Sequence, residues 1–194
     1  MGLRAVAFVT VFAILVCTAT SISATSVIPP TFEGLVDSAT EIFVGTVVNR
    51  ECRWVATPWG RVIFTFVTFR IEESLKGGLR GQTTLQFRGG TVGEVTISVA
   101  DMPEFQVGNR DLIFVGDRTA VSPLVGFMHG RFRIRHDAKS GVDRVDKHDG
   151  RPLRSTTELG ASQIVTTATG TTELTVAEFR AQILARLQTS QRAR

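Results

Sequence analysis

Apolar side chains near the start of the chain follow a helical spacing. Phe32, Leu35 and Val36 would share one face of an α-helix over residues 31–39. Thr31 is a residue type whose hydroxyl group caps helix N-termini. The pattern therefore predicts a short helix that leads into the first strand.

After this segment apolar and polar residues alternate, which is the pattern of β-strands. Gly45 interrupts the first alternating run and predicts a bulge or a strong bend. The second run is long for one strand, and such a strand usually bends to serve two parts of a sheet, so its partly apolar second face is expected near the closure of a barrel. The predicted strands are residues 41–48, 61–74, 83–88, 95–99, 112–115 and 125–135, followed by a charged hairpin over 139–149.

The last part of the chain returns to a helical spacing. Residues 155–175 are rich in threonine and punctuated by glycine, which predicts a linker or a loosely packed coil. Thr175 followed by Glu178 has the spacing of a capping box. The apolar stripe that follows consists of Phe179, Ile183, Leu184 and Leu187. It predicts an amphipathic helix over residues 176–188, docked on the β domain.

The N-terminus has the features of a secretory signal peptide. Arg4 gives a positive start, residues 5–16 form an uncharged apolar run, and small residues lead to a predicted cleavage after Ala24. The run is too short to cross a bilayer as a helix. We therefore expect a secreted or periplasmic protein of about 170 residues, enough for one domain with a sizeable core.

Composition narrows the expected chemistry only slightly. Cys17 lies in the predicted leader, so Cys52 would be alone in the mature chain and could form no intrachain disulfide. We interpret Cys52 as a small buried residue on a strand, with a reactive or intermolecular thiol as the alternative. The formal net charge of +4 is spread along the chain and does not require a nucleic-acid partner.

The sequence contains no familiar catalytic or cofactor motif. It lacks a serine elbow, a zinc-protease motif, a CxxC pair, a phosphate-binding loop and a dinucleotide fingerprint. We therefore expect a non-enzymatic protein that needs no cofactor. An exported hydrolase with a dispersed site around His129 and His136 stays open as an alternative, because catalytic groups can converge from distant positions.

Two polar clusters have residue types that bind ions. The first consists of His136, Asp137, Asp143, Asp146, His148 and Asp149. Basic residues interleave with it, which favours a solvated hairpin without a metal. The second is Arg131, Arg133 and Arg135, which project from one side of a predicted strand and could bind an anion or polyanion. Nucleic acid is a poor fit there, because Phe132 points the other way.

A loop with aromatic and basic residues is predicted between the first two strands. It contains Arg53, Trp54, Pro58 and Trp59. Tryptophan and arginine on the loop of a rigid scaffold are typical anchors for a protein partner, whereas covering the open end of a barrel is the alternative. This loop is the best candidate in the sequence for a contact surface.

The order of these segments resembles a group of uncharacterised secreted bacterial proteins over residues 32–137. The motifs that carry the resemblance are Glu72-Glu73-Ser74-Leu75-Lys76-Gly77, Arg88-Gly89-Gly90 and Phe105-Gln106-Val107-Gly108. Residues 39–47 and Leu75-Lys76-Gly77 also resemble the netrin-like OB barrels, which include the tissue inhibitors of metalloproteinases. That resemblance implies a five-stranded barrel, with helices packed on it, that binds a protein.

One departure limits what the resemblance can imply. Those inhibitors chelate the protease zinc through an N-terminal cysteine, and the predicted mature end near Thr25 has no cysteine. Their set of disulfides is missing as well. Zinc chelation therefore does not carry over, and only the scaffold with a partner-binding role does.

These patterns combine into one prediction. We expect a mainly β protein, an OB-type closed five-stranded barrel with a short N-terminal helix and a C-terminal amphipathic helix. Its parts are a signal peptide (1–24), a barrel domain (25–150), a Thr-rich linker or coil (151–174) and a helix packed on the barrel (175–190). The expected function is non-enzymatic binding or modulation of another exported protein, for example a protease.

Overall fold

The computed structural model describes residues 28–160 and 172–192, so the predicted leader and part of the predicted linker lie outside the described residues. The short helix is present as α2 (Phe32–Ser38), and the Thr31 hydroxyl accepts a hydrogen bond from the Gly34 amide. The strands are β1 (Glu41–Thr57), β2 (Gly60–Lys76), β3 (Gln82–Arg88), β4 (Gly90–Val92), β5 (Val95–Ile97), β6 (Arg110–Val115), β7 (Arg131–Asp137) and β8 (Val142–Asp146). A 3-10 turn, η1 (Thr156–Glu158), and the helix α3 (Val176–Arg192) complete the described chain.

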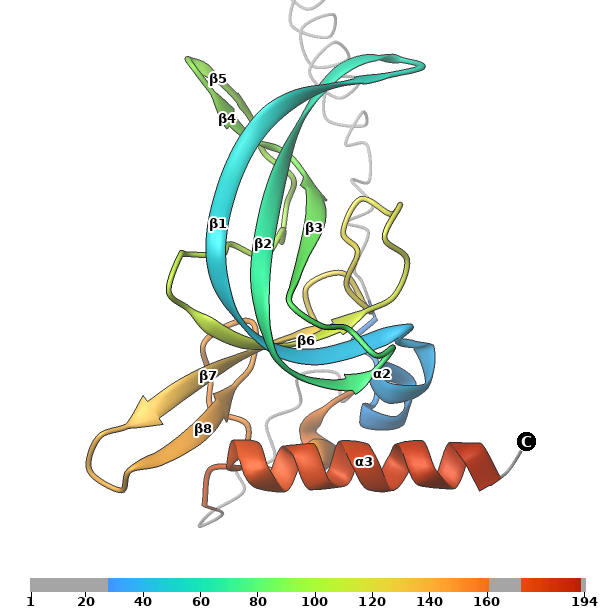
Figure 1. The fold of residues 1–194 in the computed structure, drawn as a ribbon, viewed down its shortest axis with the longest axis vertical. Coiled ribbons are helices and arrows are strands. Elements are labelled where there is room, and N and C mark those ends of the chain that lie inside the picture. The colour runs from blue at the N-terminus through green and yellow to red at the C-terminus, as the bar shows by residue number, and fades with distance from the viewer. Residues whose placement is uncertain (1–27, 161–171, 193–194) are drawn as a thin grey trace, which may run out of the picture.

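Six of the strands form one antiparallel sheet in the order β3-β2-β1-β6-β7-β8, and β4 and β5 form a separate hairpin. Figure 1 shows β1 and β2 as long, strongly curved strands that rise well above β6, β7 and β8. Irregular register between β1 and β2 accompanies this curvature, with one shift between Val44 and Gly45. The bulge or bend predicted at Gly45 is therefore confirmed.

The prediction of a closed five-stranded barrel is wrong, although the chain is mainly β. The six-stranded sheet is open, with β3 at one edge and β8 at the other. Closure would require these two edges to pair, but other segments already cover them. The Arg88 amide donates to the Val121 carbonyl beside β3, and the Val145 amide donates to the Leu174 carbonyl beside β8.

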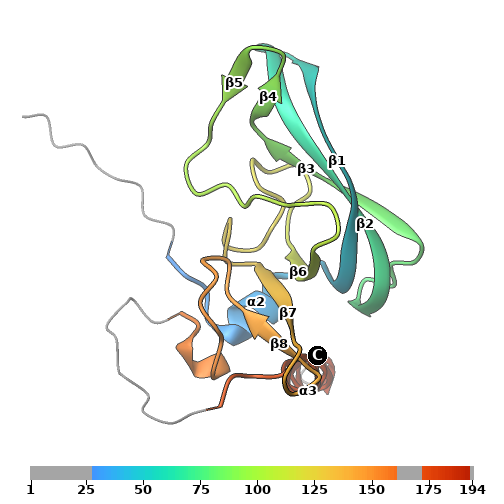
Figure 2. The same cartoon turned by 90° about the vertical axis from the view of Figure 1, so that its left-hand side faces the viewer.

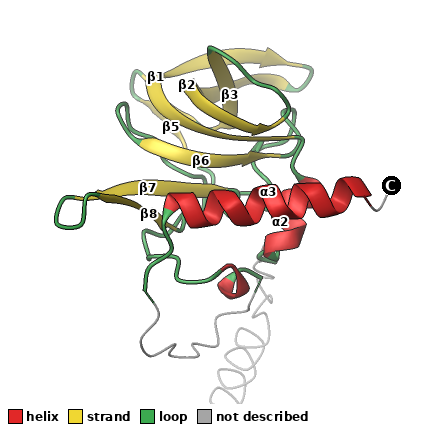
Figure 3. Cartoon of the chain, turned by 60° about the horizontal axis from the view of Figure 1, so that its bottom comes forward, coloured by secondary structure: helices red, strands yellow, loops and turns green. Residues whose placement is uncertain are grey.

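The lower part of the sheet is apolar on both faces, and the helices cover one of them. Figure 3 shows α2 and α3 lying together against one face of the sheet, next to β6 and β7. The core between them consists of Phe32, Leu35, Val36, Ala39, Ile42, Val44, Leu112, Phe114, Phe132, Ile134, Val145, Leu153, Leu174, Phe179 and Ile183. Burial of Leu153 and Leu174 shows that the flanks of the predicted linker pack into this core.

A second core fills the other face, where the curved strands fold over loops. It consists of Phe43, Val47, Val67, Phe69, Leu85, Phe87, Phe105, Ile113, Val115 and Leu124. Phe105 comes from the loop before β6, and Leu124 comes from the loop after β6. Loops rather than a second wall of strands therefore close this side of the sheet.

Two sequence predictions fail in ways that the backbone explains. The strand predicted over residues 125–135 begins only at Arg131. Gly126 and Phe127 have positive φ angles of 63° and 66°, which an extended strand does not allow. Conversely, β1 continues to Thr57, through the segment predicted as a loop. The capping box before α3 is confirmed, since the Thr175 amide and the Glu178 carboxylate hydrogen-bond at 2.9 Å.

Candidate functional site

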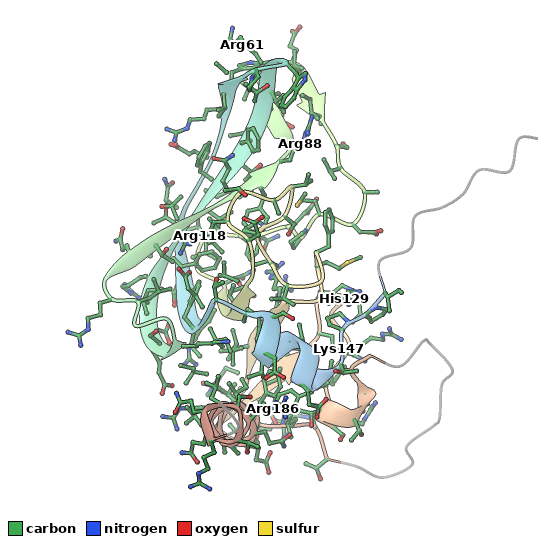
Figure 4. All side chains as sticks on the ribbon, turned by 90° about the vertical axis from the view of Figure 1, so that its right-hand side faces the viewer. Arg61, Arg88, Arg118, His129, Lys147 and Arg186 are labelled. Carbon is green, nitrogen blue, oxygen red and sulfur yellow. The ribbon has the colours of Figure 1, made fainter. Side chains whose placement is uncertain are left out.

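The β1–β2 hairpin extends beyond the rest of the sheet. β1 pairs with β6 only from Glu41 to Thr46, whereas its pairing with β2 continues to Thr57 and Gly60. We call residues 49–63 the hairpin end, and Figure 1 shows it at the top of the molecule, far from α3. In Figure 4, Arg61 marks this end and Arg186 on α3 marks the opposite one.

A tight turn closes the hairpin end. Thr57 pairs with Gly60, so only Pro58 and Trp59 lie between the strands, and the Thr57 hydroxyl donates to the Gly60 carbonyl at 2.7 Å. Proline fixes its own φ angle, and glycine accepts the positive φ of 116° that the turn needs. The turn holds Trp59 with 93% of its surface exposed.

The four residues of the predicted contact loop do not form one surface. Arg53 and Trp54 are neighbours in β1, so their side chains lie on opposite faces of the sheet. Arg53 lies on the outer face with its guanidinium 3.9 Å from the centre of the Phe66 ring. Trp54 lies on the inner face, where Arg61 stacks over it at 5.3 Å. Each face of the hairpin end therefore carries its own arginine–aromatic pair.

The β4–β5 hairpin packs against the inner face of the hairpin end. A Cβ atom on Gly90 would lie 2.6 Å from the Thr65 hydroxyl and 2.7 Å from the Cys52 sulfur, so only glycine allows this approach. The Thr65 hydroxyl also donates to the Gly89 carbonyl at 2.8 Å. Cys52 is half-buried at this contact rather than fully buried, and it lies 3.3 Å from the Thr65 hydroxyl.

Two open hollows lie on the surface. One, of about 400 Å³, adjoins the outer face of the hairpin end and is lined by Arg53, Phe66, Thr84, Leu85, Gln86 and Arg118. The other, of about 690 Å³, lies between the end of β2 and the last turns of α3. Its polar group Asp37 is bonded to Arg186 and Ser190, and the Arg186 guanidinium holds the pKa of that carboxyl below its ordinary value. Neither hollow is lined by a histidine.

The three arginines of β7 have different surroundings. Arg131 is buried, with its Nε 2.9 Å from a carboxylate oxygen of the buried Asp111 and its guanidinium 4.2 Å from the Phe105 ring centre. Arg135 is bonded to Asp146 and Glu173. Arg133 is exposed and makes no hydrogen bond or ion pair with the described residues. Two of the three arginines proposed for anion binding are thus already paired with carboxylates of the same chain.

The histidines lie in two separate places. His136 is exposed and its Nδ1 is 2.8 Å from Asp143, with no hydroxyl or thiol bonded to it in the described chain. His129 and His148 stack edge to face, with ring centres 4.6 Å apart. Burial is the main cause that lowers the pKa of both His129 and His148. The arrangement supplies a carboxylate and an imidazole at His136, but no third group that would complete a hydrolytic site.

The charged cluster around β7 and β8 is ion-paired with basic residues of the same chain. Asp143 is bonded to His136 and Arg110, Asp146 is bonded to Arg135, and Asp149 is bonded to Arg151. Within residues 28–160 and 172–192, no three histidine, cysteine or acidic side chains are grouped so that they could hold a metal ion.

Comparison with known protein families, with curated proteins and with solved structures finds no match to this chain. The netrin-like resemblance therefore stays a prediction. None of the helices in the described ranges is long and apolar enough to cross a membrane.

Proposed function

We propose that this protein is an exported, non-enzymatic binding module that contacts another exported protein through its hairpin end. The observation that carries the proposal is the 93% exposure of Trp59 at the tip of a hairpin that projects from both cores. An indole at this position contributes nothing to core packing. Tryptophan is among the residue types that contribute most to protein interfaces.

The stiffness of the hairpin end supports the same proposal. Strand pairing runs without a gap from Asn49 to the turn, and proline and glycine occupy the turn itself. The Arg53–Phe66 and Arg61–Trp54 stacks fix further side chains on the two faces. Because these groups are ordered before a partner arrives, binding loses less conformational entropy than it would on a flexible loop.

The test is to capture partners of the purified chain from the secretome of its own source and to measure the affinity of the captured protein for two variants. For Trp59→Ala we expect the affinity to fall about thirtyfold or more, the effect of losing an interface hot spot. Its thermal stability should stay unchanged, because an exposed side chain contributes about 0.5 kcal/mol or less to folding.

Ile28→Ala is the matched control, because Ile28 is 84% exposed but precedes α2 in the body of the molecule. It should leave the affinity unchanged. Equal affinities of Trp59→Ala and the unmodified protein would contradict the proposal, as would equal losses in both variants.

A further inference from the structure

The two outer strands of the sheet, β3 and β8, are contacted along their free edges by other segments of the chain. Beside β3, the Arg118 guanidinium donates to the Thr84 carbonyl, and the Arg88 amide donates to the Val121 carbonyl. Beside β8, Val145 is bonded through its amide to Leu174 and through its carbonyl to the Leu153 amide. Natural sheets commonly protect their edges in this way against pairing with another chain.

The upper half of β1 is a further edge, and no other strand of the described chain pairs with it. β6 pairs with β1 only as far as Thr46, and one further pair of bonds joins Val47 to Gly108 and Asn109. Within the part of the chain that the structure describes, the only backbone partner of β1 from residue 49 to residue 57 is β2. In an antiparallel strand, alternate amides and carbonyls point away from the existing partner. Alternate amide and carbonyl groups of residues 49–57 therefore point away from β2.

The β4–β5 hairpin packs against one face of β1 next to this open edge. Gly90 packs under Cys52, and in Figure 1 the hairpin crosses β1 and emerges on the side away from β2. Val95 on this hairpin is 47% exposed. A strand added next to β1 would thus have backbone donors and acceptors on one side, and beneath it the β4–β5 hairpin, whose exposed residues include Val95, Thr91, Glu94 and Thr96.

The charge along the open edge is positive. Arg50 is exposed and forms no ion pair with a described residue, and Arg61, on the neighbouring strand β2, stacks on Trp54. Glu51, the one acidic residue on this stretch, is already paired with Arg53 at 3.4 Å. These arginines complement acidic side chains on an incoming strand, because carboxylates accept charge-assisted hydrogen bonds from guanidinium groups.

We infer that the open edge of β1, residues 49–57, binds an extended acidic segment of the partner protein as an added β-strand. The inference rests on the proposed function and specifies how the partner is held: main-chain bonds supply affinity, and side-chain charge supplies selectivity. A second copy of this chain fits the edge less well. If two copies paired through this edge around a two-fold axis, the β4–β5 hairpins of both copies would lie on the same face of the joined sheet. They would meet near Cys52, where the hairpin of each copy already packs.

The test uses three synthetic peptides of about nine residues, matched in length to the open edge. The first alternates glutamate and valine, the second alternates lysine and valine, and the third is the acidic peptide with alternate backbone amides methylated. The acidic peptide should bind about tenfold or more tighter than the other two. It should also slow amide hydrogen exchange within residues 49–57 and not within β8.

Charge reversal on the protein sharpens the test. Arg50→Glu should weaken binding of the acidic peptide and strengthen binding of the lysine peptide, while Arg154→Glu, exposed and remote from this edge, should change neither.

Equal binding of methylated and unmethylated acidic peptides would overturn strand addition. If Trp59→Ala still abolished capture of the partner, the proposed function would stand without this mode of binding. A dimer in analytical ultracentrifugation that Arg50→Glu dissociates would mean that a second copy occupies the edge, which would also overturn the inference.

Discussion

The two halves of β1 serve opposite purposes. In the lower half, Ile42 and Val44 pack against the helices while Phe43 and Val47 pack into the second core, so both faces are buried. In the upper half, residues 49–57 carry charged side chains, an open edge and two arginine–aromatic stacks. One strand thus supplies both core packing at its lower end and an accessible surface at its upper end.

The halves also differ in what holds them together. Buried apolar area stabilises the body, where phenylalanine rings meet edge to face. Hairpin pairing, tight glycine contacts and exposed stacking hold the upper half, and each of these contributes less. Substitutions in the body should therefore cost global stability, whereas those in the upper half should loosen it locally.

The largest expected effect comes from Phe179→Ala in α3. Phe179 is fully buried, and its ring contacts those of Phe32, Phe114 and Phe132. Removing the ring should lower the free energy of unfolding by about 3–5 kcal/mol, measured by urea denaturation. The adjacent exposed residue is the control: Arg180→Ala removes only a surface ion pair with Glu73 and should leave the free energy of unfolding nearly unchanged. Similar losses in both variants would mean that α3 is not part of the main core.

A smaller effect is expected from Gly90→Ala, where the β4–β5 hairpin meets the upper half of β1. The substitution combines a positive φ of 127° with a Cβ contact shorter than 3 Å, so the hairpin must shift at a cost of about 1–3 kcal/mol. Gly93→Ala is the matched control, because Gly93 has a φ of 61° and open space around it. Hydrogen exchange should speed up in β4 and β5 more for Gly90→Ala than for Gly93→Ala. Equal changes would show that backbone strain alone matters.

The smallest effect is a dependence of stability on pH, and it belongs to the body. Burial lowers the pKa of His129 and His148 in the folded protein below the ordinary value of 6.5. The unfolded chain therefore takes up protons first as the pH falls below about 6.5, and stability declines in that window. Carboxyls with lowered pKa values, such as Asp37 and Asp143, cause a further decline only below their ordinary value of 3.8. Replacing His148 with Gln should flatten the first decline in thermal melting and leave the second; an unchanged first decline would rule out this pair as its cause.

Alternation and capping signals predicted much of the body. The helix after Thr31, the capping box at Thr175 and the irregularity at Gly45 all follow from local chemistry that is readable in one sequence. Sheet closure was not readable in this way. Whether β3 and β8 meet depends on which loops reach their edges, and the Arg88–Val121 and Val145–Leu174 bonds join residues far apart in sequence.

The candidate site was only partly predictable for a related reason. Trp59 and Pro58 drew attention as residue types that a core does not need, and they do occupy an exposed turn. The sequence predicts Arg53 and Trp54 in a loop between the first two strands. They are in fact in a strand, since a two-stranded projection outside the core needs no apolar face to stay paired. The open edge of β1 carries no sequence signal at all, because it is defined by where β6 stops.

The continuity of β1 also has a mechanical consequence. Since this strand runs unbroken from between the two cores to the turn at Pro58, tension applied at the tip travels along covalent backbone into the sheet without crossing a flexible connection. The projection therefore acts as a lever arm clamped at its base, and a load on its far end is borne by the layer of the sheet that lies between the two cores.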